Sequence, residues 1–279
     1  MTAPDVPRSS PWSRRSMLRA LAPLPLLAVG GCGGSGAASG SSGTARTSAA
    51  APRTSAAAST SPTPTVVGAT PVALTQPEVS QAPAVTDAVA LTFHGDGTPE
   101  LAEALLSEAE KADARLTVLA VGRWLARYPQ MAERVLKGGH ELGNHTENHL
   151  DIDAMSESQA YDEIERCAQR LEQLTGSRGR WFRQSQAQHA NTVVRAAAKR
   201  AGYGTLLSYD LDPLDYTDPG SSRIVNNVLD QVRGGDVVSL HLGHSETVTA
   251  LPTILAGLER RGLRAVTASE LFPTTQTQR

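Results

Sequence analysis

Cysteine is scarce in this 279-residue chain, which holds only Cys32 and Cys167 and so offers no disulfide framework. An excess of one charge is also missing, because 26 Lys and Arg residues face 28 Asp and Glu residues. This balance gives no indication of nucleic-acid binding. The uncharged stretch at residues 20–31 is too short to span a bilayer as a stable helix. No internal repeat is present in about the last 190 residues.

The first 31 residues have the composition of an export signal. Arg14 and Arg15 stand in a segment similar to a twin-arginine signal, and the uncharged stretch follows directly. It ends in Val-Gly-Gly before Cys32, which resembles a lipoprotein processing box. We therefore expect residues 1–31 to be removed and Cys32 to carry a lipid, which would leave an extracytoplasmic membrane lipoprotein facing the cell wall. Cleavage of an ordinary signal peptide at another position is the alternative.

Residues 32–85 are dominated by Ser, Ala, Thr, Gly and Pro after the cysteine, with almost no large apolar side chain before Val66. Such a segment buries too little surface to offset its ordering entropy, and we expect a disordered tether. The remaining residues 86–279 are enough for one domain. Within that domain Cys167 lies in a helix-like run and is expected to be a core thiol.

Short apolar runs alternate with amphipathic runs along this domain. Strands are predicted at residues 88–93, 116–120, 205–209, 236–241 and 264–266, and helices at residues 99–112, 128–137, 156–175, 192–201, 222–233 and 249–261. This alternation indicates an α/β fold in which helices cover a parallel sheet.

Two histidines four residues apart, His145 and His149, are the most informative residues. Neutral imidazole is a common ligand of Zn²⁺ and related divalent cations. On a helical turn this spacing places both rings on one side, close enough to share one cation. The pair therefore predicts a metal site, and two polar surface histidines are the alternative. The zinc-protease motif is excluded because Thr146, and not glutamate, follows the first histidine.

Further residues with chemical potential follow the predicted strands. In barrels of parallel strands, chemistry gathers at the carboxyl ends of the strands. Seven side chains fall at or just beyond such ends and are expected to face one cavity: His94, Asp96, His145, Arg183, Asp210, Asp212 and His241.

Five segments, read in order, resemble the five motifs of the polysaccharide deacetylase (NodB-like) family of carbohydrate esterases. They lie at residues 91–97, 139–149, 180–183, 212–216 and 238–241, and the resemblance covers about residues 86 to 273. It implies a distorted, incomplete (β/α) barrel of about seven parallel strands. It also implies metal-dependent hydrolysis of N-acetyl or O-acetyl groups on a glycan.

The first motif departs from the family's pattern Thr-Phe-Asp-Asp-Gly. His94 stands in place of the aspartate that acts as general base, and Gly95 in place of the aspartate that binds the metal. Asp96 comes one residue late. Either the loop bulges so that Asp96 reaches the metal, with His94 as the base or as a third nitrogen ligand, or His145 and His149 are the only protein ligands.

The resemblance implies roles for the remaining motif residues. Tyr216 replaces a tryptophan and can stack on a sugar ring, whereas residues 184–187 lack the prolines and aromatics that wall the family's groove. His241 would protonate the leaving group while a fourth-motif aspartate holds its tautomer. The implied catalytic residues are His94, Asp96, Arg183, Asp212 and His241, the substrate-binding residues Asp215, Tyr216 and Leu240, and the metal ligands Asp96, His145 and His149.

We therefore expect a membrane-anchored, zinc-dependent polysaccharide deacetylase, acting as a monomer on an acetylated polysaccharide or oligosaccharide. The alternative is a catalytically weak member that binds glycan or metal without turnover. The altered first motif and the missing groove wall of the third motif favour the alternative, and the intact residues His145, His149, Arg183 and His241 favour the enzyme. The polymer is left open among peptidoglycan, chitin oligomers, other acetylated amino sugars and acetylated xylan.

Overall fold

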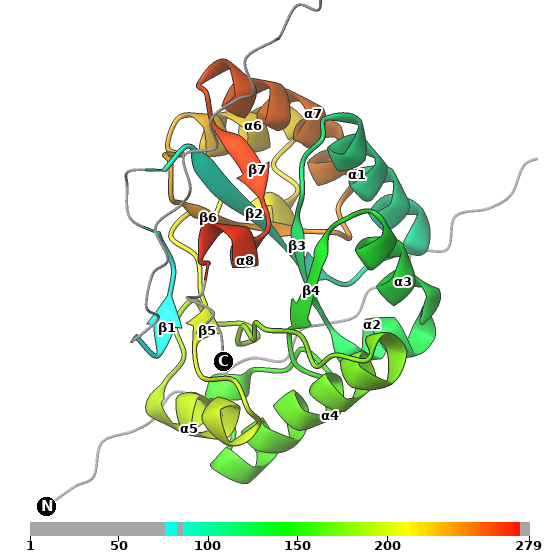
Figure 1. Ribbon diagram of the computed structural model, residues 1–279, viewed down its shortest axis with the longest axis vertical. Coiled ribbons are helices and arrows are strands. Elements are labelled where there is room, and N and C mark those ends of the chain that lie inside the picture. The colour runs from blue at the N-terminus through cyan, green and yellow to red at the C-terminus, as the bar shows by residue number, and fades with distance from the viewer. Residues whose placement is uncertain (1–75, 83–85, 274–279) are drawn as a thin grey trace, which may run out of the picture. The chain divides into compact units, whose positions relative to one another are not determined.

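The computed structural model describes residues 76–82 and 86–273, and these residues form the architecture in Figure 1. The expected export signal, the lipid on Cys32 and residues 32–75 of the expected tether lie outside them.

A parallel sheet forms the centre of the domain. It contains β2 (Ala88–Gly95), β3 (Thr117–Ala120), β4 (Glu141–Asn144), β6 (Val237–His241) and β7 (Arg264–Val266). The order is β4-β3-β2-β6, and β7 pairs with the first residues of β2. The first six residues of β2 are buried, as a strand covered on both faces requires. The register places His94 beside His241, so two site residues stand on adjacent strands.

A second, smaller sheet extends this arrangement. Strand β1 (Glu78–Val79) pairs in parallel with β5 (Leu206–Leu207). Single bridges join Asn144 to Phe182 and Leu211 to Val238, and the Leu207 amide donates to the Phe182 carbonyl. Strand segments thus lead from β4 through β5 to β6, in a ring completed by bridges and not by continuous strands. The expected parallel α/β fold is confirmed.

Most helices lie outside the strands, whereas the short helix at residues 268–271 is drawn near the middle of the ring of strands in Figure 1. Their bounds are α1 (Pro99–Lys111), α2 (Gly122–Arg127), α3 (Gln130–Lys137), α4 (Glu157–Thr175), α5 (Thr192–Arg200), α6 (Ser221–Leu229), α7 (Ser245–Arg260) and α8 (Ala268–Leu271), with 3-10 turns η1 (Ile152–Ala154) and η2 (Asp215–Thr217). Helix α4 begins with a capping box between Ser156 and Gln159 and ends at Gly176, whose φ of 75° suits glycine. None of the helices in the described ranges is long and apolar enough to cross a membrane.

The core confirms one expectation and moves one boundary. Cys167 is fully buried on α4, and burial raises the pKa of its thiol to about 12, so it packs as a small apolar side chain. Val79 and Ala82 are buried in an apolar cluster that also contains Ala90, Val237 and Phe272. The ordered domain therefore includes residues 76–82, ahead of the boundary at residue 86 that composition suggests.

Candidate metal centre and active site

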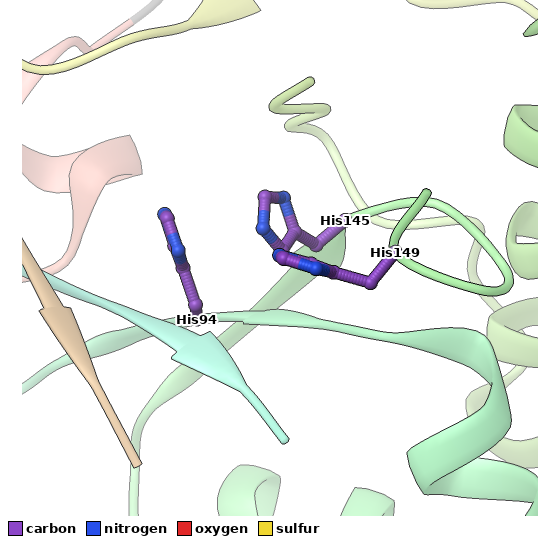
Figure 2. Close-up of side chains that lie close together, drawn as sticks. All are labelled: His94, His145 and His149. Carbon is purple, nitrogen blue, oxygen red and sulfur yellow. The ribbon is translucent and has the colours of Figure 1, made fainter. Parts of the chain in front are cut away.

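Three imidazoles meet at the carboxyl ends of the central strands. His94 comes from the end of β2, His145 follows β4 directly, and His149 lies four residues further on. One ring nitrogen from each lies within 4.8 Å of the other two. Figure 2 shows His94 facing the other two rings across a short gap. The ring centroid of His145 lies 4.1 Å from that of His94 and 4.8 Å from that of His149.

The donor set has one feature that fits a bound cation. Nδ1 of His145 lies 3.0 Å from the Arg183 carbonyl oxygen, and because that oxygen can only accept, Nδ1 carries the proton. Nε2 of His145 is then an unprotonated nitrogen, and it is buried without a partner. A buried acceptor without a hydrogen-bond donor destabilises the folded state, so a bound cation at this lone pair would be stabilising. Three neutral imidazoles suit a divalent cation with nitrogen ligands.

The prediction that His145 and His149 lie on a helical turn is wrong. Strand β4 ends at Asn144, and residues 145–149 form a loop in which Thr146 and His149 have φ values of 66° and 56°. The Asn144 side chain accepts from the Thr146 amide, and the Thr146 hydroxyl accepts from the His149 amide. These bonds turn the chain back on itself. The two rings therefore meet without a helix.

The neighbouring helices hold this ligand loop. The Glu163 carboxylate of α4 accepts from the Asn148 amide at 2.8 Å and from its side chain at 2.6 Å. Glu147 is buried and pairs with Arg170 at 2.6 Å. At Gly122, where α2 begins, a Cβ would lie 1.9 Å from the Glu147 carboxylate. The loop is thus positioned before any ligand arrives, which favours tight binding. Sequence reasoning missed these supports.

At Gly95, the first-motif position where the family has its metal-binding aspartate, the structure has no space for a side chain. A Cβ at Gly95 would lie 2.9 Å from the Ala120 Cα and 2.9 Å from the Val118 side chain, so β3 leaves no room for a side chain. The Asp96 carboxylate lies 2.8 Å from Arg123 and is 41% exposed. The structure therefore does not bring Asp96 into the imidazole cluster, but places it at the rim.

His94 contacts the arginine of the third motif. Its Nε2 lies 3.3 Å from Nη1 of Arg183 and 3.3 Å from the Ser239 hydroxyl. Arg183 is fully buried and donates to the carbonyls of Leu207 and Ser208, and burial lowers its pKa to about 9. Burial, followed by the nearby histidines and Arg183, lowers the pKa of His94 well below its usual value. The contact that the family makes to an acidic residue is thus made here to an imidazole.

A histidine and an aspartate form a second chemical unit beside the cluster. Nδ1 of His241 lies 2.7 Å from Oδ1 of Asp215, whose other oxygen accepts from the His241 amide and the Thr247 hydroxyl. Asp215 is fully buried, and the His241 ring centroid lies 4.5 Å from that of His94. Asp215, expected to bind substrate, is therefore the aspartate that holds His241.

The other candidate residues are spread over different environments. Asp212, expected to be catalytic, accepts from the Leu214 amide in a turn, and burial raises its pKa. Tyr216 is 47% exposed, with its ring 5.2 Å from His241. Leu240, expected to line the acetyl pocket, is fully buried in the apolar core. Asp210 accepts from the Val237 amide at the opposite end of β6 from His241, so it does not share the cavity.

Two pockets of about 340 Å³ each flank the imidazoles. His94, His149 and His241 line both. One continues over Asp96, Gly97, Val121, Gly243 and His244. The other continues over Gln186, Ala187, Gln188, Tyr209, Asp212, Tyr216 and Ser239, so glutamines form the wall where the family has prolines and aromatics.

The metal-free protein is expected to lose stability as the pH falls from about 7 to about 5. Burial is the largest cause that lowers the pKa of His94, His145 and His149 from 6.5. In this pH window the histidines become protonated in the unfolded chain but stay neutral in the folded chain. The free energy of unfolding therefore falls as the pH falls. The slope is at most roughly 1.4 kcal/mol per pH unit for each fully buried histidine. Urea denaturation of the chelator-treated protein at several pH values measures this dependence. If His145→Gln leaves the plot of unfolding free energy against pH unchanged, the prediction is contradicted.

A parallel α/β domain with an imidazole cluster and a His–Asp pair at the carboxyl ends of its strands has the organisation of a hydrolase. Comparison with known proteins then identifies the family. The polysaccharide deacetylase family model matches residues 82–206. A peptidoglycan-N-acetylglucosamine deacetylase of Bacillus cereus is 35% identical over 195 residues, which cover 66% of this chain and 87% of that protein. The chain belongs to the polysaccharide deacetylase family, as its motifs indicate.

Solved structures show the same fold. The peptidoglycan deacetylase PdaC of Bacillus subtilis superposes with a TM-score of 0.62 at 26% identity, covering 68% of this chain and 91% of that one. A CE4 family pseudoenzyme from Bacillus anthracis superposes with a TM-score of 0.67 at 23% identity, covering 71% and 69%. The second likeness concerns the fold alone. The family therefore contains both enzymes and a member described as a pseudoenzyme.

Proposed function

We propose that this protein is an extracytoplasmic, metal-dependent deacetylase that hydrolyses N-acetyl or O-acetyl groups of a cell-wall glycan. The observation that carries the proposal is the buried, partnerless Nε2 of His145, gathered with His94 and His149. The similarity to a peptidoglycan-N-acetylglucosamine deacetylase supports an acetylated amino sugar as the substrate class.

The proposed metal site consists of His94, His145 and His149, with Zn²⁺ as the preferred ion. Because Gly95 has no room for a carboxylate and Asp96 pairs with Arg123, the imidazole of His94 is the group best placed to complete the set. A cation held there supplies Lewis acidity toward the acetyl carbonyl. Asp96 then serves at the rim of the pocket and not as a ligand.

The remaining chemistry comes from the chain's own side chains. Asp215 accepts the Nδ1 proton of His241, so Nε2 of His241 is free to deliver a proton to the leaving nitrogen or oxygen. The half-exposed ring of Tyr216 offers a face for a sugar. Gln186 and Gln188 provide polar side chains along the same pocket, where sugar hydroxyls would bind.

Two single substitutions test the ligand assignment. His94→Ala is expected to lower the zinc bound by the full-length protein, whereas Asp96→Ala is expected to leave it at the wild-type level. Metal analysis after purification without chelators measures both, and circular dichroism checks the fold. The reverse pattern, with zinc lost only from the Asp96→Ala protein, would return Asp96 to the ligand set.

Binding without turnover is the second candidate function. It is favoured by one observation: within residues 76–82 and 86–273, the cluster of possible metal ligands contains histidines and no carboxylate. Acetate release from N-acetylated peptidoglycan, chitin oligomers and acetylated xylan separates the two functions. A zinc-loaded wild-type protein that releases no acetate from any of them would establish the binding function.

Membrane attachment through a lipid on Cys32 is also part of the proposal. Cys32→Ser is expected to move the protein from the membrane fraction to the soluble fraction of cells, because the lipidated residue is lost. Fractionation and immunoblotting measure the change, with Cys167→Ser as a matched control that keeps the processing box. A Cys32→Ser protein that stays as membrane-bound as the wild type would contradict the lipoprotein assignment.

A further inference from the structure

A second imidazole–carboxylate pair lies beside His241 and Asp215. Nδ1 of His244 is 2.8 Å from Oδ1 of Asp218. Both pairs join the same two chain segments. One segment is the η2 turn with the residue that follows it, the other is the end of β6 with the loop after it, and the partners are three residues apart on each. The ring centroids of His241 and His244 are 5.8 Å apart and the rings are nearly perpendicular at 79°. The structure thus contains two histidine–aspartate pairs side by side.

His244 opens onto the catalytic pocket. It immediately precedes α7 and lines the same pocket as His94, His149 and His241, with 27% of its side chain exposed. The loop that carries it touches the first motif, because a Cβ at Gly97 would lie 2.5 Å from the Gly243 Cα. The pair therefore lies next to the motif in which the family's general base is replaced.

The other candidate bases facing the pockets are otherwise engaged. Asp96 pairs with Arg123, and Asp212 is tied into a turn by the Leu214 amide. Nε2 of His94 lies 3.3 Å from Nη1 of the Arg183 guanidinium, a group that only donates, so this nitrogen already accepts a hydrogen bond. The Asp218 carboxylate instead accepts a hydrogen bond from Nδ1 of His244, which leaves Nε2 of His244 as the nitrogen that can accept a proton. Its own 62% exposure makes this support weaker than that of the buried Asp215.

We propose that His244, held by Asp218, is a second catalytic acid–base residue and serves as the general base of the deacetylation; this rests on the proposed function. Nε2 of His244 takes a proton from the attacking water as its oxygen bonds to the acetyl carbon. The carbon–nitrogen bond then breaks as Nε2 of His241 gives its proton to the leaving nitrogen. Acetic acid and a free amine result, and proton return from His244 to His241 through solvent restores both imidazoles.

The test uses the full-length, zinc-loaded protein and a chitin oligomer, penta-N-acetylchitopentaose, as the probe. His244→Gln is expected to lower kcat by about 10² to 10⁴ with zinc content and KM close to wild type. Asp218→Asn, on the protein surface, is expected to lower kcat less. His189→Gln is the matched control, since this exposed histidine pairs with Glu78 and lines neither pocket.

Two further measurements separate a chemical role from a structural one. Added imidazole is expected to restore part of the activity of His244→Ala, because the pocket is open to solvent there. Long-range proton–nitrogen NMR spectra of the zinc-loaded protein are expected to show the Nδ1–H tautomer of His244, and a smaller population of it in Asp218→Asn.

Distinct results would overturn the inference. Wild-type kcat in His244→Gln removes His244 from the chemistry and leaves the proposed function intact. Zinc lost together with activity, or no rescue by imidazole, makes His244 structural. A wild-type protein that holds zinc and releases no acetate overturns the proposed function, and this inference with it.

Discussion

Replacing His145 and His149 together by alanine is expected to reduce the zinc bound by the purified protein from about one equivalent to background. His145 contributes a buried nitrogen that has no protein partner, and His149 completes the pair across 4.8 Å between ring centroids. With both gone, His94 alone remains, and one imidazole does not hold a divalent cation against water. Metal analysis after purification without chelators measures the loss, and circular dichroism shows whether the fold persists.

The single variants refine this expectation. His145 is fully buried and its Nδ1 donates to the Arg183 carbonyl, so its orientation is fixed. His149 is only partly buried. His145→Ala is therefore expected to weaken zinc binding more than His149→Ala, and His189→Ala, an exposed control, should change nothing. Unchanged zinc content in the double variant would contradict the metal assignment altogether.

His241→Gln is expected to lower kcat for acetate release by about 10² to 10⁴ while the protein keeps its zinc. Glutamine keeps a polar side chain of similar reach but does not exchange a proton near neutral pH. Asp215→Asn is expected to follow it, because Asp215 holds Nδ1 of His241 at 2.7 Å and sets the tautomer. Steady-state kinetics with an N-acetylated oligosaccharide and metal analysis on the same samples provide the measurement.

Asp212→Asn is the matched control for Asp215. The Asp212 side chain accepts from a backbone amide in its own turn and does not contact His241 through a hydrogen bond. We therefore expect a small effect on kcat and a larger one on KM, since Asp212 lines the pocket. An Asp212→Asn protein that loses as much kcat as Asp215→Asn would show that the two aspartates share the role. Full activity in His241→Gln would remove the leaving-group assignment.

The positions of several motif residues could be predicted from local sequence patterns. The buried run of β2 could be predicted from its sequence, and with it the position of His94 at a strand end. The fifth motif places His241 at the end of β6 in the same way. Because parallel strands present their carboxyl ends at one edge, the meeting of His94, His145, Arg183 and His241 could be predicted without any distance. Asp210 shows the limit, since a residue near a predicted strand lies at the other end of β6.

The conformations of the loops at the site could not be predicted from local sequence patterns. The pattern predicts a helical turn at the histidine pair, but the Asn144 and Thr146 side chains and the supports from α2 and α4 form a loop instead. Those partners are remote in the sequence. Similarly, the spacing in the fourth motif does not distinguish Asp212 from Asp215, because the choice depends on how the η2 turn packs against β6.

The sequence by itself determined the family, the parallel α/β class and the histidines of the site, because these depend on local periodicity and on motif order along the chain. Only the tertiary structure decided that β3 leaves no space for a side chain at Gly95. It also decided that Arg123 pairs with Asp96 and that Asp218 accepts a hydrogen bond from His244. Each of these is a contact between segments brought together by strand register and helix packing. A one-residue shift of a loop changes which carboxylate reaches which imidazole. The distance between a carboxylate and an imidazole on different segments cannot be read from the linear sequence.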